Sequence, residues 1–574
     1  MVSRFLLAVS LAATPTVLAG QVPTVASDTV AESLRGADDV TGIAHDAQAR
    51  FERIRLRHAP LTFSGGGGYC DEQVGRFCTT YQEGEWYPRE EAAEIVRARM
   101  ELLAELDSLQ RLSPADGWIL GQRVWYRGES GGWEGALGVA RMCEADEAWW
   151  CFALRGLVLH ALGRYGESLH EFDSSLALMA PDVARAWRVP ERAVDRGVRG
   201  ALEDAEEAGP DSLSAALATL WTLADPLYLV EGNDRLTAHY ARWTVSNLRD
   251  GSANPYGMRW SDDLEELTVR HGWELGWERT VGSLTVGREG ALGHKHPEGR
   301  DYMPAGRALR DPSSARAEDL AAGRRQPRSL YAPPYAPVLL PLETEVAVFP
   351  RGDHAMFVAT PFLPEDTTFH SKHDHPRPWL DAGDQADMAD RIGLFALPLA
   401  GGEPIGSTGT GSSEGVLVLD VPAGDYVLSV ESWAPRLRRA GRARMGIRIG
   451  PAPADVATAS DLLLLRGADS PPGSLEEALP LVFLRPRIGP GEPLAVAWEI
   501  SGLGFRPETL QYALSVERTD RNVLRRVGEF FRLATPSRPL ELAWQEPAPD
   551  RPKPSSATWL WTYPRWTPAT TKSP

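Results

Sequence analysis

Three histidines close together form the clearest metal-ligand pattern in this chain. His370, His373 and His375 lie within six residues, and imidazole nitrogens are common ligands of zinc. If a turn brought the three side chains together, they would form a zinc site, and the chain would be a metal-dependent enzyme. Pro376 follows directly, and the run is typical of an exposed polar loop between strands. We therefore expect no metal ion and no other cofactor here, and we keep the enzyme as the alternative.

A second pair of histidines is less specific. His294 and His296 would point to the same side if they lay on a strand, because side chains alternate along a strand. Such a pair can bind a ligand or lie on a solvated surface, and we favour the solvated surface.

The carboxylates between residues 262 and 266 are the candidates for acid–base chemistry, which requires such groups. Their spacing fixes no pair at a catalytic distance. Ser261 or Asp262 fits the start of a helix over 263–270 instead, where a short polar side chain caps free amide groups. The sequence contains no nucleophile elbow, phosphate-binding glycine loop, His-Glu-x-x-His pair or dinucleotide fingerprint. These observations favour a protein that is not an enzyme.

The four cysteines fall into two pairs of equal spacing. Cys70 and Cys78 are eight residues apart, as are Cys143 and Cys151. Structural zinc sites favour tighter spacings such as Cys-x2-Cys. Free thiols and a metal site are the alternatives, but two local disulfides are the simpler interpretation in an oxidising compartment. The sequence predicts the disulfides Cys70–Cys78 and Cys143–Cys151.

The elements that position these residues are clearest between Phe152 and Pro181, where small and large residues recur at fixed spacing. The small residues let two helices approach closely, and the aromatic residues fill the gap beside them. This pattern resembles one helix pair of a tetratricopeptide (TPR) repeat. The residues that carry the resemblance are Gly156, Leu159, Gly163, Tyr165, Ser168 and Phe172.

Apolar periodicity predicts more helices before this pair. A helix over 89–109 follows Pro88, and a degenerate TPR-like pair is expected over 114–142 with its turn at Gly131 and Gly132. We therefore predict a TPR-like helical domain over 89–222.

Tryptophan is frequent in this region. The chain has 19 tryptophans, and each buries a large area. A dense group of them serves either helix packing, which we favour, or a platform for a carbohydrate or other ligand. The resemblance to TPR proteins implies a binding surface, and we expect a partner on the inner face of the helices between Trp118 and Leu178.

Residues 223–299 have a different character. Trp260, Ser261 and Asp262 are followed by Arg270, His271 and Gly272. This order resembles the exported bacterial proteins named for their GWxTD motif, in which a Trp-x-Thr-Asp segment precedes a strand and an Arg-Tyr-Gly turn. The resemblance implies export and a mixed segment, and it implies no activity.

The second half of the chain alternates between short apolar runs and turns. Residues 300–340 are rich in arginine and proline and predict a linker. Short strands then predict a β-sandwich over 341–452 and a second β domain over 453–549. The run from Pro422 to Tyr426 resembles the turn of immunoglobulin (Ig)-like sandwiches in which a tyrosine fills a corner. Residues 550–574 are rich in Ser, Thr and Pro and predict a disordered tail.

The start of the chain predicts export. Arg4 precedes an apolar run, and small or apolar residues end it at Ala19, as a signal peptidase requires. We therefore assign 1–19 to a signal peptide and 20–88 to an N-terminal segment that contains the Cys70/Cys78 loop and a helix over 44–57. No later segment is apolar for long enough to span a membrane. The expected location is periplasmic or extracellular.

Charge narrows the partner class. The net charge of −18 disfavours nucleic acid and anionic membranes, which bind positive surfaces, and leaves cationic and neutral partners open. We predict a multidomain α plus β protein, with an N-terminal TPR-like helical array followed by one or two Ig-like β-sandwich domains. The predicted function is an exported, non-enzymatic binding or scaffold protein of the cell envelope with a protein or peptide partner. The alternative is a metal-dependent enzyme with the histidine-rich loop on the β-sandwich half.

Overall fold

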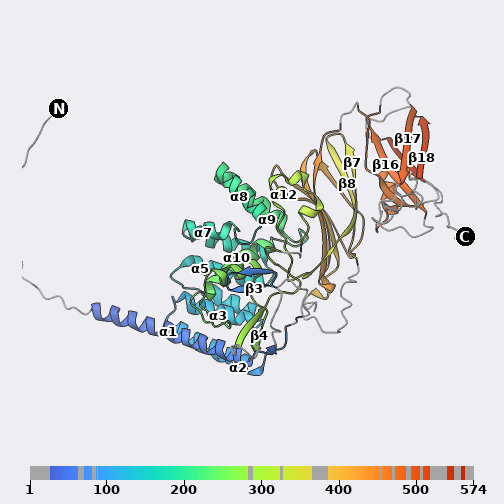
Figure 1. Cartoon of the computed structure of the whole chain (residues 1–574). Helices are drawn as coiled ribbons and strands as arrows, with labels where there is room; N and C mark the ends of the chain where they lie inside the picture. Colours follow the sequence, from blue (N-terminus) through green and yellow to red (C-terminus); the bar gives the residue numbers. More distant parts are fainter. Residues whose placement is uncertain are drawn as a thin grey trace, which may run out of the picture.

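The computed structural model has a helical N-terminal half and a strand-rich C-terminal half, as the sequence predicts (Figure 1). The residues that it describes are 26–62, 70–79, 86, 88–281, 289–323, 327–364, 385–452, 456–467, 472–485, 493–503, 509–516, 540–547 and 557–562. The described helices are α1 (Ala26–His58), α2 (Ala93–Leu112), α3 (Gly117–Glu129), α4 (Trp133–Arg141), α5 (Ala148–Ala161), α6 (Tyr165–Leu178), α7 (Pro181–Arg188), α8 (Arg196–Ala208), α9 (Pro210–Ala224), α10 (Asp234–Arg249), α11 (Asp262–His271), α12 (Gly306–Arg310) and α13 (Leu475–Ala478).

The strands lie mostly after residue 337. Those before it are β1 (Leu61–Thr62), β2 (Glu72–Val74), β3 (Phe77–Thr79), β4 (Gly276–Val281) and β5 (Glu289–His294). Those after it are β6 (Val338–Pro341), β7 (Glu343–Arg351), β8 (His354–Phe362), β9 (Arg391–Pro398), β10 (Ile405–Thr410), β11 (Leu417–Pro422), β12 (Gly424–Ala434), β13 (Arg439–Ile449), β14 (Thr458–Ala459), β15 (Leu463–Arg466), β16 (Leu494–Ser501), β17 (Thr509–Val516), β18 (Leu540–Pro547) and β19 (Ala557–Thr562).

Helix pairs α3/α4 and α5/α6 follow one another in the helical half. Asp116 begins α3 by accepting a hydrogen bond from the amide of Ile119 at 2.9 Å. Gly131 and Gly163 end the first helix of each pair with φ of +84° and +75°, a left-handed conformation that strains other residues. The glycines therefore fix both turns, and the sequence predicts the one at Gly131.

Helix α10 lies against the first helices of both pairs. Nδ1 of His160 on α5 is 3.0 Å from Oγ1 of Thr237 on α10. Nε2 of Gln122 on α3 donates to the carbonyl oxygen of Leu248 at 2.8 Å. The inner face on which we expected a partner is therefore covered by the chain's own α10. Apolar periodicity identifies α10 as a helix but does not say which surface it packs on.

Two sheets form the first part of the β half. Their strand orders are β10-β9-β12-β13-β6 and β11-β8-β7, and they share a core that contains Phe357, Leu394 and Leu428. Strand β9 is buried on both faces, because Phe395 points away from that core and contacts Tyr228 of the helical half. The larger sheet thus joins the two halves of the molecule.

The second part of the β half has a sheet in which β14 and β15 pair with β16, and a separate pair β17–β18. Phe349 of β7 and Leu465 of β15 lie in one buried cluster, so this part packs on the smaller sheet. Strand β19 pairs antiparallel with β16, so residues 557–562 form a strand rather than part of a disordered tail. The rest of 550–574 lies outside the described residues.

Residues 300–340 differ from the expected linker. Tyr302, Tyr331 and Tyr335 are only 2%, 6% and 6% exposed, and they join the cluster between the helices and the larger sheet. Strand β6 and helix α12 lie in the same stretch. The arginine and proline content of residues 300–340 is typical of loops. It gives no indication that the tyrosines of this stretch are buried.

Both predicted disulfides are present. The Cα atoms of Cys70 and Cys78 are 5.5 Å apart, and those of Cys143 and Cys151 are 5.6 Å apart.

Helix α2 begins at Ala93 rather than Arg89. Within the described ranges, no helix is both long and apolar enough to span a bilayer.

Candidate functional site

The candidates for metal binding and catalysis do not assemble into a site among the described residues. His370, His373 and His375 lie outside them. In the part of the chain that the structure describes, no three His, Cys, Asp or Glu side chains are grouped as metal ligands.

The histidine pair is split between two surroundings. His294 stacks on Trp86, with ring centroids 4.2 Å apart, and its Nε2 lies 3.1 Å from Oε2 of Glu278. Burial lowers the pKa of His294, although the Glu278 carboxylate opposes this. His296 lines a different cavity, together with His160. The two imidazoles thus do not act on one ligand.

The carboxylates near the start of α11 are held by arginines. Asp263 Oδ2 pairs with Arg76 Nε at 2.6 Å, and the hydrogen bond from Arg76 lowers the pKa of Asp263. Glu266 pairs with Arg270 at 3.1 Å and with Arg328 at 3.0 Å. Helix α11 begins at Asp262, after Ser261, but the Ser261 side chain makes no capping hydrogen bond to a backbone amide and donates to Asp263 Oδ1 instead. Ion pairs with arginines therefore hold Asp263 and Glu266 in place.

The residues that carry the TPR resemblance lie together between α5 and α6. Ser168 Oγ donates to the carbonyl oxygen of Gly156 at 2.7 Å. Phe172 fills the space beside Gly156, where a Cβ atom would lie 2.8 Å from the ring. Leu159 is 4% exposed and Tyr165 is 2% exposed. Gly156, Ser168 and Phe172 therefore hold the α5/α6 pair together, while Gly163 is exposed in the turn between the two helices.

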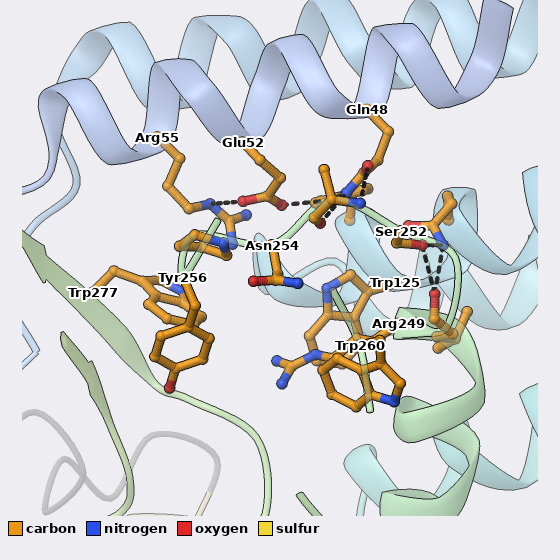
Figure 2. A pocket seen from close by; sticks show the side chains of 15 residues that line it. Gln48, Glu52, Arg55, Trp125, Arg249, Ser252, Asn254, Tyr256, Trp260 and Trp277 are labelled. Atoms are coloured by element: carbon orange, nitrogen blue, oxygen red, sulfur yellow. Dashed lines mark hydrogen bonds and ion pairs between the residues drawn. The ribbon is translucent and has the colours of Figure 1, made fainter. Parts of the chain in front are cut away.

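One cavity near α1 is too small for an organic ligand. It is enclosed by Gln48, Glu52 and Arg55 of α1 and by side chains around Asn254 (Figure 2). Its volume is about 30 Å³, which is the space of one water molecule in the liquid. The Tyr126 hydroxyl donates to Glu52 Oε1 at 2.6 Å. These contacts fasten α1 to the helical half.

A larger hollow opens where α3 and α5 begin and α10 ends. Its volume is about 400 Å³, within the range of ligand pockets. We call it the acidic tryptophan pocket. Its lining residues are Ala115, Asp116, Gly117, Trp118, Gln122, Ala145, Asp146, Glu147, Trp149, Trp150, Asn247 and Leu248. None of these is a lysine or arginine.

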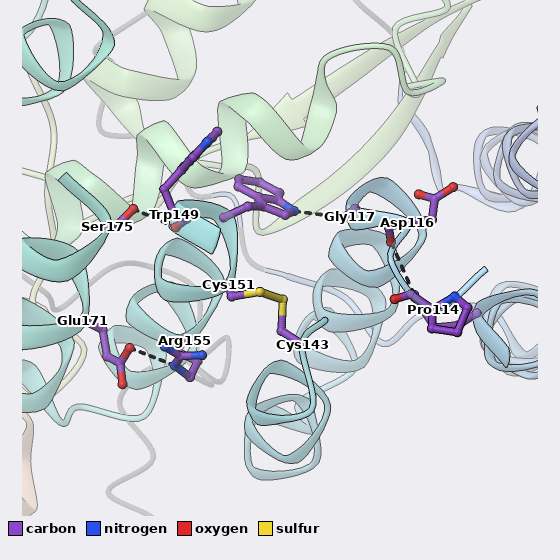
Figure 3. The surroundings of a disulfide bond; sticks show 11 residues. Pro114, Asp116, Gly117, Cys143, Trp149, Cys151, Arg155, Glu171 and Ser175 are labelled. Carbon is purple, nitrogen blue, oxygen red and sulfur yellow. Dashed lines mark hydrogen bonds and ion pairs between the residues drawn. A yellow bond between two sulfur atoms is a disulfide. The ribbon is translucent and has the colours of Figure 1, made fainter. Parts of the chain in front are cut away.

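The tryptophan rings of this pocket are fixed by the surrounding helices. Trp118 stacks on His45 of α1, with centroids 3.8 Å apart, and its Nε1 donates to Ser252 Oγ at 3.2 Å. Trp150 Nε1 donates to the carbonyl oxygen of Gly117 at 2.9 Å, beside the start of α3 (Figure 3). Rigid aromatic walls lose little conformational freedom when a ligand binds.

A disulfide fixes the acidic side of the pocket. Cys143 lies in the connection after α4, and Cys151 lies on α5, so the bond closes a loop that includes Asp146 and Glu147 (Figure 3). Both acids are exposed, and within the described ranges neither has an ion-pair partner. Asp116 differs, because its oxygens accept hydrogen bonds from the Ile119 amide and the Thr41 hydroxyl.

The pocket has the chemistry of a binding site for a cation. Carboxylates attract a positive charge, and the faces of tryptophan rings attract cations through the ring quadrupole.

No known family model, curated protein or solved structure matches the chain. The identification of the candidate site therefore depends on the residues of this chain alone. The sequence signal that could have located the pocket was the spacing of Trp118, Trp149 and Trp150 around the Cys143/Cys151 loop. That signal does not reveal the contribution of α10, which is distant in sequence.

Proposed function

We propose that the protein is an exported, non-enzymatic binding protein that takes a basic segment of a partner protein into the acidic tryptophan pocket. The observation that carries the proposal is the combination of fixed tryptophan rings with two exposed acids that have no ion-pair partner within the described ranges. An arginine or lysine side chain would satisfy both features at once.

The overall charge supports the same class of partner. A net charge of −18 attracts a cationic segment from a distance and disfavours nucleic acid. The two disulfides fit an oxidising compartment, which agrees with export.

The proposal also covers the fold types of the helix pairs and of the two sheets. We propose that α3/α4 and α5/α6 are TPR-type pairs and that the two face-to-face sheets form an Ig-like sandwich. The hydroxyl of Tyr426 donates to the carbonyl oxygen of Pro422 at 2.9 Å, which supports the corner expected of such a sandwich. The helix pairs hold the pocket, and the sandwich serves as a support.

Fluorescence anisotropy with two labelled peptides tests the proposal. One peptide is rich in arginine, and the other carries citrulline, a neutral analogue of similar shape, at every arginine position. We expect the arginine peptide to bind about tenfold more tightly than the citrulline peptide, with an affinity that falls as salt is added. Equal binding of the two peptides, or none by either, would contradict the proposal.

A pair of variants locates the binding. Ala145→Arg places a guanidinium beside the pocket and should weaken the arginine peptide about tenfold or more. Glu144→Gln changes the net charge by the same amount on the same connection, but Glu144 does not line the pocket. If both variants weaken binding equally, the effect comes from overall charge and the pocket is not the site.

A further inference from the structure

A second cavity lies beside the middle of α10. Its volume is about 140 Å³, several times the space of one water molecule. Most of the side chains that line it are apolar, and they come from α10, from the segment after α11 and from 330–334. The apolar and small members are Ala238, Gly272, Trp273, Leu275, Gly299, Leu330, Ala332 and Pro334.

One buried positive charge faces this cavity. Arg242 is 5% exposed, and its Nη1 donates to the carbonyl oxygens of Val269 at 3.3 Å and Arg270 at 2.8 Å. Its Nη2 donates to the carbonyl oxygen of Leu330. These partners are neutral, and among the described residues no carboxylate lies within ion-pair distance of Arg242.

Several buried arginines elsewhere in the molecule pair with a carboxylate, whereas Arg235 and Arg442 donate to neutral oxygens. Arg444 Nη2 lies 2.9 Å from Glu431 Oε1, and both side chains are fully buried. Arg270, also fully buried, pairs with Glu266 at 3.1 Å. A buried charge without a partner of opposite sign is costly. Of Arg235, Arg242 and Arg442, only Arg242 lines this cavity, where a negatively charged ligand would offset the cost.

Three imidazoles complete the polar part of the cavity, from His160, His271 and His296. Burial, with the charges of Arg242 and Arg235, lowers the pKa of His160 to about 3. Burial, followed by Arg270, also holds the pKa of His271 well below its usual value. These two rings are therefore neutral near pH 7, so Arg242 supplies the positive charge.

We propose that this cavity binds a small organic monocarboxylate, whose carboxylate lies on Arg242 and whose apolar part lies against Leu275 and Ala332. The apolar lining selects a singly charged ligand with an apolar body over inorganic phosphate, which carries polar oxygens on every side. The inference does not depend on the acidic tryptophan pocket, which has the opposite charge.

Isothermal titration calorimetry of the full chain with benzoate and benzamide tests the proposal. The two probes have nearly the same shape and differ in charge. In a buffer of low chloride, we expect benzoate to bind with a Kd of about 1 mM or tighter. Benzamide should bind at least about tenfold more weakly, because it carries no negative charge to pair with the guanidinium.

Two variants place the ligand. Arg242→Gln should weaken benzoate at least about tenfold. Ala332→Leu fills the cavity without removing Arg242, and it should abolish binding even if the Arg242 variant fails to fold. Equal binding of benzoate and benzamide, no binding of benzoate, benzoate binding that Ala332→Leu leaves unchanged, or tighter binding of inorganic phosphate would each overturn the proposal.

Discussion

Two cavities on helix α10 carry opposite charge. The acidic tryptophan pocket lies at the end of α10, beside Asn247 and Leu248, and its acids are exposed. The cavity at Arg242 lies along the middle of the same helix, and its guanidinium is buried. In both sites, a charged side chain lies next to aromatic or apolar side chains. Among the described residues, that charged side chain has no ion-pair partner.

Charged side chains that stabilise the fold differ from those that are available to bind a ligand. Arg444 and Glu431 are fully buried and pair with each other at the junction of the two halves. Such a pair satisfies itself and leaves nothing for a ligand. The charged groups of the two cavities have no such ion-pair partner among the described residues. Each cavity should therefore select a ligand of the opposite charge.

Replacing a buried arginine gives the largest expected effect. Arg444→Gln leaves the Glu431 carboxylate buried without its cation, which should cost about 3–5 kcal/mol of stability. Arg242→Gln removes hydrogen bonds to carbonyl groups only and should cost less, about 1–3 kcal/mol. Urea unfolding of both variants measures the difference. A greater loss of stability in the Arg242 variant would mean that Arg242, rather than Arg444, is the arginine that stabilises the fold. That result would contradict the distinction between the two arginines.

The helix that joins the two sites should make stability depend on pH. Burial raises the pKa of Asp234 to about 7, against hydrogen bonds from Tyr331 and Tyr335. The folded state therefore keeps a proton that the unfolded chain, with an ordinary carboxyl pKa near 3.9, releases at lower pH.

This stabilisation is complete below the unfolded pKa and is lost as pH rises through about 7. The loss approaches about 1.4 kcal/mol per pH unit between those values. Asp234→Asn cannot titrate, so its unfolding midpoint should vary less between pH 5 and pH 8. Identical pH profiles for the variant and the parent protein would show that Asp234 is not the responsible group.

The two disulfides offer a matched test of how the acidic pocket is fixed. Each closes a loop between cysteines eight residues apart, so by the loop-entropy model each contributes roughly 2–3 kcal/mol. Replacing both cysteines of either pair by serine should lower stability by a similar amount. Only the Cys143/Cys151 change should also weaken the arginine peptide, because that loop carries Asp146 and Glu147. Weaker peptide binding after the Cys70/Cys78 change would point to a general loss of structure.

Local features were predictable from the sequence, since they depend on neighbours in the chain. The spacing of Cys143 and Cys151 sufficed for a disulfide, and Gly131 and Gly163 marked the turns that they form. The short apolar runs that predicted strands in 341–452 correspond to β7, β8, β9, β11 and β12, while β10 and β13 were not predicted. The division into a helical and a strand-rich half followed from the same periodicities.

Features that depend on distant contacts were not predictable. Arginine and proline made 300–340 resemble a linker, while the burial of Tyr331 and Tyr335 depends on helices and strands far away in sequence. Nothing near Arg242 in the sequence shows that its guanidinium bonds to carbonyl groups of residues 269, 270 and 330. Both candidate sites need α10 in its packed position, and only the folded chain shows that position.

A double-mutant cycle between the acidic pocket and its ligand tests the central claim most directly. The protein is either unchanged or carries Asp146→Asn with Glu147→Gln, and the peptide carries arginine or citrulline. If the two carboxylates contact the guanidinium groups, calorimetry should give a coupling free energy of about 0.5–2 kcal/mol. The acid substitutions should then leave binding of the citrulline peptide nearly unchanged. A coupling energy of zero, with the arginine peptide bound equally well by both proteins, would contradict the account.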